Sequence, residues 1–290
     1  MSFVSNTSSQ PCMKTVQSGC IKRLVKDVSD LYKNPLHDEG IYYIHDDEDM
    51  LFGYALIIGP KDSCYEHGYF MFKFQFPTDY PHSPPKVSFK TNSGKVRVHP
   101  NLYRSEKVCL SLLNTWQGEG WTSCQTIRSV LMVLLSILDD KPLLHEPGFS
   151  EKNLNHIPQI KSYSKIIRYF TLNHMYFRMS EPSYSLSEFE IFRDIIEETS
   201  KNRLLDVCRK VEMSVKDPEF DKQTLYKMDF YSFEYNINYK GLKGVLETRV
   251  KKHDMLKEYS DMLKEVDDIF SLPTSTPTIG EVYVSNSLSL

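Results

Sequence analysis

The sequence predicts an α+β fold with an N-terminal helix, a four-stranded antiparallel meander, a catalytic loop and C-terminal helices. Three observations support this fold class. Apolar residues recur at helical spacing between residues 21 and 32, four strand-like segments follow at hairpin spacing, and helical patterns return from residue 127 onward. At 290 residues, 40% of them hydrophobic, the chain can bury a full core and carry an extension.

The first helix follows a segment rich in Ser, Thr, Gln and Asn, and we expect residues 1–18 to be flexible. Its apolar residues are spaced for a single stripe: Ile21, Leu24, Val25, Val28, Leu31 and Tyr32. The dipeptide Asn34-Pro35 should end the helix, because the residue before a proline disfavours helical geometry.

Four strands are predicted over residues 41–44, 51–58, 69–76 and 86–90. In the third, phenylalanine occupies every second position from Phe70 to Phe76, which is the period of a strand. Four prolines between residues 77 and 85 stiffen the connection to the last strand. The hairpin spacing indicates an antiparallel meander.

Residues 91–122 have no periodicity, and a connection of this length inside a compact domain is typically functional. The segment contains the tripeptide His99-Pro100-Asn101 eight residues ahead of Cys109. A thiolate is a strong nucleophile, and an uncharged amide donor can stabilise an oxyanion. We therefore predict that Cys109 carries an acyl group and that Asn101 helps to transfer it.

The rest of the chain reads as helical. Thr122 or Ser123 should cap a buried helix that runs through Ile137, and a rigid loop covers residues 143–149. Further helices are expected over residues 158–179, 186–216 and 238–270. We place the catalytic core at residues 19–180, a helical C-terminal extension at 181–270 and a flexible tail at 271–290.

Composition narrows the class of protein. A formal net charge of −3 argues against a generic nucleic-acid binder, and no apolar run is long enough to cross a bilayer. The N-terminal residues lack the features of a signal peptide. The six cysteines are scattered without paired spacing, so we expect neither a metal site nor a disulfide framework, and a cytoplasmic or nuclear location.

Residues 19–150 resemble the catalytic core of ubiquitin-conjugating enzymes. The order of the elements matches: helix, meander, YP…PP loop, HPN, Cys, Trp and helix. The segment CLSLLNTWQGEGW carries four extra residues before the second tryptophan, and HEPGF follows later. This insertion, HEPGF and the long C-terminal part are similar to the Z-type members of the family.

The resemblance implies that Cys109 accepts ubiquitin or a ubiquitin-like protein from an activating enzyme as a thioester. Cys109 then passes the modifier to a substrate lysine or to a ligase cysteine. The modifier, the activating enzyme and a ligase are thus the implied partners, with neither nucleic acid nor a membrane. No cofactor is implied, because ATP is used by the activating enzyme.

The resemblance also assigns roles around the cysteine. Glu146 would favour loss of a proton from the incoming lysine, although it also fits a solvated loop acid. His99, Pro100 and Trp121 would support the catalytic loop. Asn101 has a structural alternative as well, since its amide could hold the loop backbone.

Two surfaces match partner sites of the family. Lys22, Arg23 and Lys26 correspond to the basic helix face that docks on the activating enzyme, while their spacing alone also fits a solvated face. The ligase-binding positions correspond to His82, Ser123 and Cys124. These residues depart from the apolar and Ser-Pro-Ala pattern that RING ligases grip, which argues against ordinary RING recruitment.

Two other readings compete with an active conjugating enzyme. One is a catalytically inactive ubiquitin-binding cofactor of the same fold, which usually lacks the cysteine. The other is a cysteine hydrolase, which needs a His base and an orienting residue at the thiol. The intact HPN tripeptide ahead of Cys109 argues against both.

Overall fold

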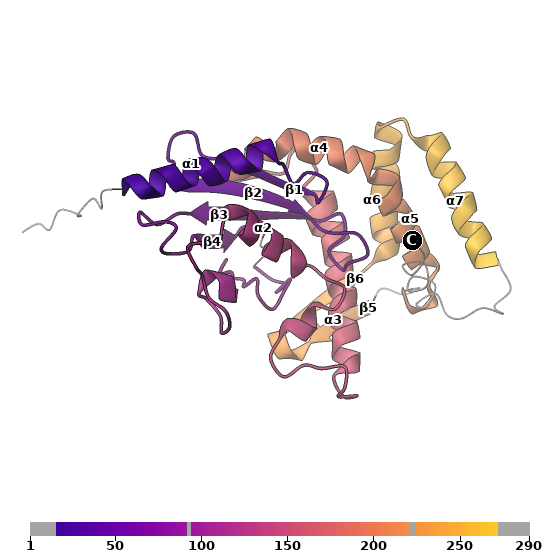
Figure 1. Ribbon diagram of the computed structural model, residues 1–290. Helices are drawn as coiled ribbons and strands as arrows, with labels where there is room; N and C mark the ends of the chain where they lie inside the picture. Colours follow the sequence, from indigo (N-terminus) through magenta and orange to yellow (C-terminus); the bar gives the residue numbers. More distant parts are fainter. Residues whose placement is uncertain (1–15, 92–93, 221–223, 272–290) are drawn as a thin grey trace, which may run out of the picture. The chain divides into compact units, whose positions relative to one another are not determined.

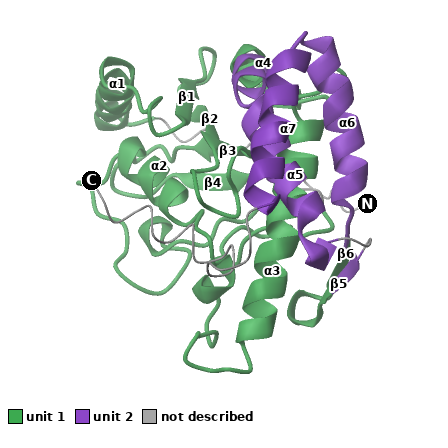
Figure 2. Cartoon of the chain, turned by 90° about the vertical axis from the view of Figure 1, so that its right-hand side faces the viewer, with its two compact units in different colours: residues 1–196, 227–235 green, residues 197–226, 236–290 purple. Residues whose placement is uncertain are grey.

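A computed structural model describes residues 16–91, 94–220 and 224–271. Residues 1–15 of the expected flexible N-terminus and residues 272–290 of the expected flexible tail lie outside this range. The chain forms two compact units, one of residues 1–196 and 227–235 and the other of residues 197–226 and 236–290 (Figure 2). Residues 181–196 and 227–235 belong to the first unit.

The sheet of the first unit is the predicted antiparallel meander (Figure 1). Its strands are β1 (Ile41–His45), β2 (Phe52–Ile58), β3 (Tyr69–Gln75) and β4 (Lys86–Phe89), in that spatial order. The register is continuous, so Phe72 of β3 lies opposite Ala55 on one side and Phe89 on the other.

Strand β3 has buried side chains on both faces of the sheet. The alternating phenylalanines of β3 are fully buried on one face, yet Tyr69 on the opposite face is fully buried too. Segments after residue 170 cover this second face: the Tyr176 ring lies 6.1 Å from the Tyr69 ring, and the Phe189 ring lies 5.6 Å from that of Tyr54. Segments after residue 170 therefore complete the burial of the sheet in the first unit.

Helix α1 (Ser18–Lys33) ends at the predicted Asn34 cap, but the predicted apolar stripe is divided between two faces. The buried residues are Cys20, Leu24, Asp27 and Leu31. Val25 and Tyr32 are 51% and 61% exposed. A helix that rests on a surface buries only a narrow stripe, and residues one position further along turn about 100° away from it.

The remaining helical elements of the first unit lead to and from the catalytic loop. They are η1 (Ser111–Leu113), α2 (Ile127–Ser136), η2 (Pro142–His145), α3 (Ile157–Phe170), the π-helix η3 (Thr171–Arg178) and η4 (Ser187–Phe192). The cap of α2 is Thr126 and not Thr122 or Ser123. The Thr126 hydroxyl accepts the backbone N–H of Ser129, whose own hydroxyl accepts the Thr126 N–H, so this pair forms the capping box.

The predicted helices after residue 186 are shorter than expected. The observed elements are α4 (Arg193–Asn202), α5 (Leu204–Lys216), η5 (Pro218–Phe220), α6 (Tyr239–Lys252) and α7 (Leu256–Ser271). Between α5 and α6, the chain forms a two-stranded sheet of β5 (Thr224–Met228) and β6 (Phe233–Ile237), which are joined through η6 (Asp229–Tyr231). No helix in the described ranges is long and apolar enough to span a membrane.

Candidate active site

Cys109 lies in a short hairpin that the HPN tripeptide begins. Leu102 forms isolated bridges with His99 on one side and Val108 on the other. The backbone N–H of Cys109 donates to the Asn101 carbonyl at 2.9 Å. The eight-residue spacing therefore returns the chain to the tripeptide and places the cysteine directly beside the asparagine.

Asn101 holds the backbone of Cys109 from the other direction. Its side-chain Nδ2 donates to the Cys109 carbonyl at 2.6 Å. Its Oδ1 is buried and accepts no hydrogen bond from the described residues. One amide N–H is thus engaged with the loop backbone in this conformation, as the structural alternative expects, while the second N–H is the donor that an oxyanion would meet.

His99 and Pro100 build the turn. The His99 ring is fully buried, and its Nδ1 accepts the Asn101 backbone N–H at 3.0 Å. Burial lowers the pKa of His99 well below its ordinary value, and the His145 ring 5.0 Å away adds to the effect. The Pro100 carbonyl accepts a hydrogen bond from Arg97. A neutral imidazole that accepts a backbone N–H orients the loop.

The thiol of Cys109 is covered by the start of the insertion. Cys109 is only 2% exposed, and its Sγ donates to the Thr115 carbonyl at 3.0 Å. The Thr115 hydroxyl accepts the Leu110 N–H at 2.9 Å and donates to the Val108 carbonyl at 2.9 Å. In this conformation Thr115 therefore covers the sulfur of Cys109.

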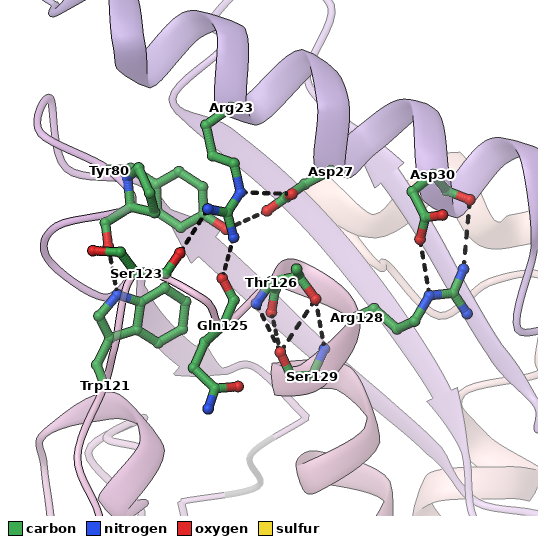
Figure 3. Close-up of polar contacts among 11 residues, drawn as sticks. Arg23, Asp27, Asp30, Tyr80, Trp121, Ser123, Gln125, Thr126, Arg128 and Ser129 are labelled. Atoms are coloured by element: carbon green, nitrogen blue, oxygen red, sulfur yellow. Dashed lines mark hydrogen bonds and ion pairs between the residues drawn. The ribbon is translucent and has the colours of Figure 1, made fainter.

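The two tryptophans of the insertion differ. Trp116 is 46% exposed. Trp121 is partly buried, and its Nε1 donates to the Pro81 carbonyl at 2.7 Å, next to the Tyr80 ring (Figure 3). The backbone N–H of Trp121 donates to the Asn114 side chain at 2.8 Å. Trp121 therefore connects the proline-rich loop to the insertion.

Glu146 follows η2 and contacts a residue that the sequence did not single out. The Tyr231 hydroxyl donates to Glu146 Oε2 at 2.5 Å. Burial and this hydrogen bond raise the pKa of Tyr231 well above its usual range. In the sequence, Tyr231 stands out only because aromatic residues are frequent between residues 230 and 239.

The three α1 residues expected to contact the activating enzyme differ in their surroundings. Lys22 and Lys26 are exposed. Arg23 points inward: its Nε donates to Asp27 at 2.8 Å, and its Nη atoms donate to the carbonyls of Ser123 and Gln125 (Figure 3). Arg23 thus connects α1 to the loop before α2, while the two lysines stay available to a partner.

The expected ligase-binding residues all lie on the surface. His82 is exposed in the proline-rich loop, and Ser123 and Cys124 are exposed before α2. Cys124 is a free thiol, and the Ser123 carbonyl accepts from Arg23 at 2.7 Å. Among the described residues, no group of three or more His, Cys, Asp or Glu side chains could hold a metal ion.

Comparison with known proteins gives one consistent result. The ubiquitin-conjugating enzyme family model matches residues 23–169. Ubiquitin-conjugating enzyme E2 Z of Danio rerio is 38% identical over 179 residues, which are 59% of this chain and 53% of that protein. The Homo sapiens E2 Z is 41% identical over 154 residues, 53% of this chain and 42% of that protein.

A more distant relative aligns over more of the chain. The probable ubiquitin-conjugating enzyme protein 17 of Caenorhabditis elegans is 31% identical over 230 residues, 75% of this chain and 31% of that protein. The chain spans about half the length, or less, of these curated relatives.

Proposed function

The chain belongs to the ubiquitin-conjugating enzyme family and is similar to its Z-type members, and from this we propose that Cys109 carries ubiquitin or a ubiquitin-like protein as a thioester. One observation carries the proposal. The backbone N–H and carbonyl of Cys109 are both hydrogen-bonded to Asn101, which holds Cys109 beside the HPN turn in space. A nucleophile held in this way needs no adjacent base when its partner is already an activated thioester.

The reaction has two steps. The Cys109 thiolate attacks the thioester carbonyl on the activating enzyme, so one C–S bond forms and the activating enzyme's C–S bond breaks. A lysine nitrogen or a ligase thiolate then attacks the new thioester, and Cys109 leaves as a thiolate. The free N–H of Asn101 stabilises the oxyanion, and the Glu146 carboxylate accepts the proton that a lysine must lose.

The partners follow from the exposed residues. We propose that Lys22 and Lys26 on α1 steer the activating enzyme, since complementary charge chiefly speeds association. A ligase would meet the surface around His82 and Cys124, which are both exposed. The five described cysteines are all free thiols, which supports a reducing compartment such as the cytoplasm or nucleus.

The alternative is an inactive ubiquitin-binding cofactor of the same fold, which the intact HPN tripeptide ahead of Cys109 argues against. A loading assay separates the two. The chain is incubated with ATP and a panel of modifiers and activating enzymes, and the products are separated with and without a thiol reductant. We expect an adduct that the reductant removes.

Two variants identify the cysteine. Cys109→Ser should form an oxyester that resists the reductant, whereas Cys124→Ser, which removes an exposed free thiol, should keep the labile adduct. The proposal is wrong if folded wild-type chain forms no adduct with any pair in the panel, or if Cys109→Ser still forms a thiol-labile one.

A further inference from the structure

Tyr231 belongs to the first unit although it lies more than 80 residues beyond the catalytic loop. Its hydroxyl donates to Glu146 Oε2 at 2.5 Å. Its ring also lies 4.9 Å from the guanidinium of Arg97, whose Nη2 donates to the Pro100 carbonyl. One side chain therefore contacts both the Glu146 loop and the arginine that holds the HPN turn.

Arg97 extends this contact toward the hairpin of Cys109. Its guanidinium lies 3.8 Å from the centre of the Tyr103 ring, two residues after Asn101. Cation–π contacts of this kind are favourable when the cation is partly removed from water. Tyr103, Arg97 and Tyr231 therefore form a continuous contact from the HPN hairpin to residues 227–235.

The two loops that Tyr231 joins also touch each other. The rings of His99 and His145 lie 5.0 Å apart, so the residue before Glu146 packs on the first residue of the HPN tripeptide. The position of the Glu146 carboxylate is thus defined relative to the catalytic loop by contacts on both sides.

Tyr231 is itself firmly held. Its backbone carbonyl accepts from Arg104 at 2.9 Å, and its ring lies 5.6 Å from that of Tyr163. The neighbouring Phe230 ring lies 5.1 Å from Phe149, on the same loop as Glu146. Burial and the hydrogen bond to Glu146 raise the pKa of the Tyr231 phenol well above its usual range, so the hydroxyl remains a donor at neutral pH.

We propose that Tyr231 is a positioning residue that holds the Glu146 carboxylate at the catalytic loop and so favours transfer of the thioester to amines over transfer to thiols. The inference rests on the proposed function. An amine acceptor arrives as an ammonium and must give up a proton before its nitrogen forms the C–N bond and the Cys109 C–S bond breaks. A thiol acceptor attacks as a thiolate already formed in solution and has no use for the carboxylate.

The test compares acceptors on loaded protein. Wild-type chain, Tyr231→Phe, Glu146→Gln and the double variant are loaded on Cys109, and discharge is then followed with free lysine and with free cysteine. Tyr231→Phe keeps the ring contacts and removes only the hydroxyl. The matched control is Tyr226→Phe, which removes a hydroxyl that donates to Glu219 at 3.3 Å on the same hairpin but in the second unit.

We expect Tyr231→Phe to load normally and to lose about tenfold in the rate of discharge to lysine, a part of the 10²–10⁴-fold typical of proton transfer by a positioned group. Discharge to cysteine should change less than about twofold, which is within the range of a surface substitution. Glu146→Gln should show the same selective loss, and the double variant should lose no more than either single variant. Tyr226→Phe should match wild type with both acceptors.

Three results would overturn the inference: unchanged discharge of Tyr231→Phe to lysine, equal losses with lysine and cysteine, or additive losses in the double variant. Should Tyr231→Phe fail to fold, the acceptor selectivity of Glu146→Gln decides in its place. A wild-type chain that forms no thioester overturns the proposed function itself, whereas a loaded chain with unaltered discharge overturns only the role of Tyr231.

Discussion

Asn101 and the backbone of Cys109 exchange two hydrogen bonds, one through the side-chain amide of Asn101 and one through its backbone carbonyl. Asn101 Nδ2 donates to the Cys109 carbonyl at 2.6 Å, and the Cys109 N–H donates to the Asn101 carbonyl at 2.9 Å. The residue expected to stabilise an oxyanion is thus also the residue that fixes the nucleophile. A variant at this position must therefore change stability and chemistry together.

Asn101→Asp tests this double role. The substitution replaces the donor with a second acceptor facing the Cys109 carbonyl, so we expect about 1–3 kcal/mol less free energy of unfolding. The rate of thioester discharge to lysine should fall more than the rate of loading. Loading is an attack by a thiolate, whereas discharge to lysine is an attack by an amine. Both tryptophans lie in the first unit, so urea unfolding followed by tryptophan fluorescence reports the stability of that unit.

Asn114→Asp is the matched control. Asn114 uses its Oδ1 to accept the Trp121 N–H at 2.8 Å, and an aspartate keeps that acceptor. We expect its unfolding to change by less than about 0.5 kcal/mol. If Asn101→Asp also leaves unfolding unchanged while discharge falls, then Asn101 acts in the chemistry and its hydrogen bond to the backbone adds nothing measurable.

The proximity of Asn101 to Cys109 could be predicted from the sequence, but the contact between Tyr231 and Glu146 could not. The HPN-to-Cys spacing is local, and a hairpin of this length brings its ends together. Tyr231 is 85 residues from Glu146, and no periodicity connects them. Its position depends on the path of the whole C-terminal region, so the sequence did not identify which of the aromatic residues between 230 and 239 would contact Glu146.

Thr115→Val should uncover the thiol. The hydroxyl of Thr115 satisfies the Leu110 N–H and the Val108 carbonyl, and the Thr115 carbonyl accepts from the Cys109 thiol. Valine has the same shape without the hydroxyl, so we expect about 1–2 kcal/mol less stability and a loosened start of the insertion. The measurement is the rate of alkylation of Cys109 by iodoacetamide in a Cys124→Ser background, which should rise several-fold.

Thr115→Ser keeps the hydroxyl and serves as the control, with an alkylation rate near that of wild type. Equal rates for Thr115→Val and Thr115→Ser would show that the hydroxyl does not govern the cover over Cys109.

Acid should destabilise the first unit through His99. Burial lowers the pKa of this residue well below 6.5, so the imidazole stays neutral in the folded chain while the unfolded chain protonates it below that pH. The unfolded state then binds the extra proton, and stability falls as pH falls, by about 1.4 kcal/mol per pH unit below 6.5. His174, whose pKa burial lowers to about 4, acts in the same direction.

The contribution of His99 is isolated by comparing slopes. His99→Asn can still accept the Asn101 N–H but does not titrate. Its free energy of unfolding should be lower than that of wild type at pH 7 and should fall less steeply between pH 6.5 and 5. Parallel slopes for the two proteins in urea titrations would contradict a buried neutral His99.

The sequence was informative about the sheet and less so about helix faces. Alternation in β3 and hairpin spacing predicted the meander, because strand period and turn chemistry are local. The burial of Tyr69 was not visible, since it depends on segments after residue 170. In α1, Val25 was expected in the buried stripe but is exposed. Asp27 is buried instead, because the Tyr80 hydroxyl and Arg23 donate hydrogen bonds to its carboxylate.

Substitution of Arg23 should therefore lower stability, whereas substitution of Lys22 or Lys26 should slow loading by the activating enzyme. Asp27 is only 3% exposed and receives both the Arg23 Nε at 2.8 Å and the Tyr80 hydroxyl at 2.5 Å. Arg23→Ala leaves a buried carboxylate without its counter-charge and two loop carbonyls without a donor, so we expect about 3 kcal/mol less stability. Lys22→Ala and Lys26→Ala should change stability by less than about 0.5 kcal/mol but slow loading by the activating enzyme, most strongly at low salt.

Arg128 supplies the matched control for the arginine. Arg128 of α2 pairs with the exposed Asp30 of α1 at 3.0 Å, so Arg128→Ala should lose much less stability than Arg23→Ala (Figure 3). Unfolding in urea measures stability, and the initial rate of thioester formation over a salt series measures docking. Equal stability losses for the two arginine variants would contradict the buried role of Arg23, and a loading rate that ignores both lysines would place the activating enzyme on a different surface.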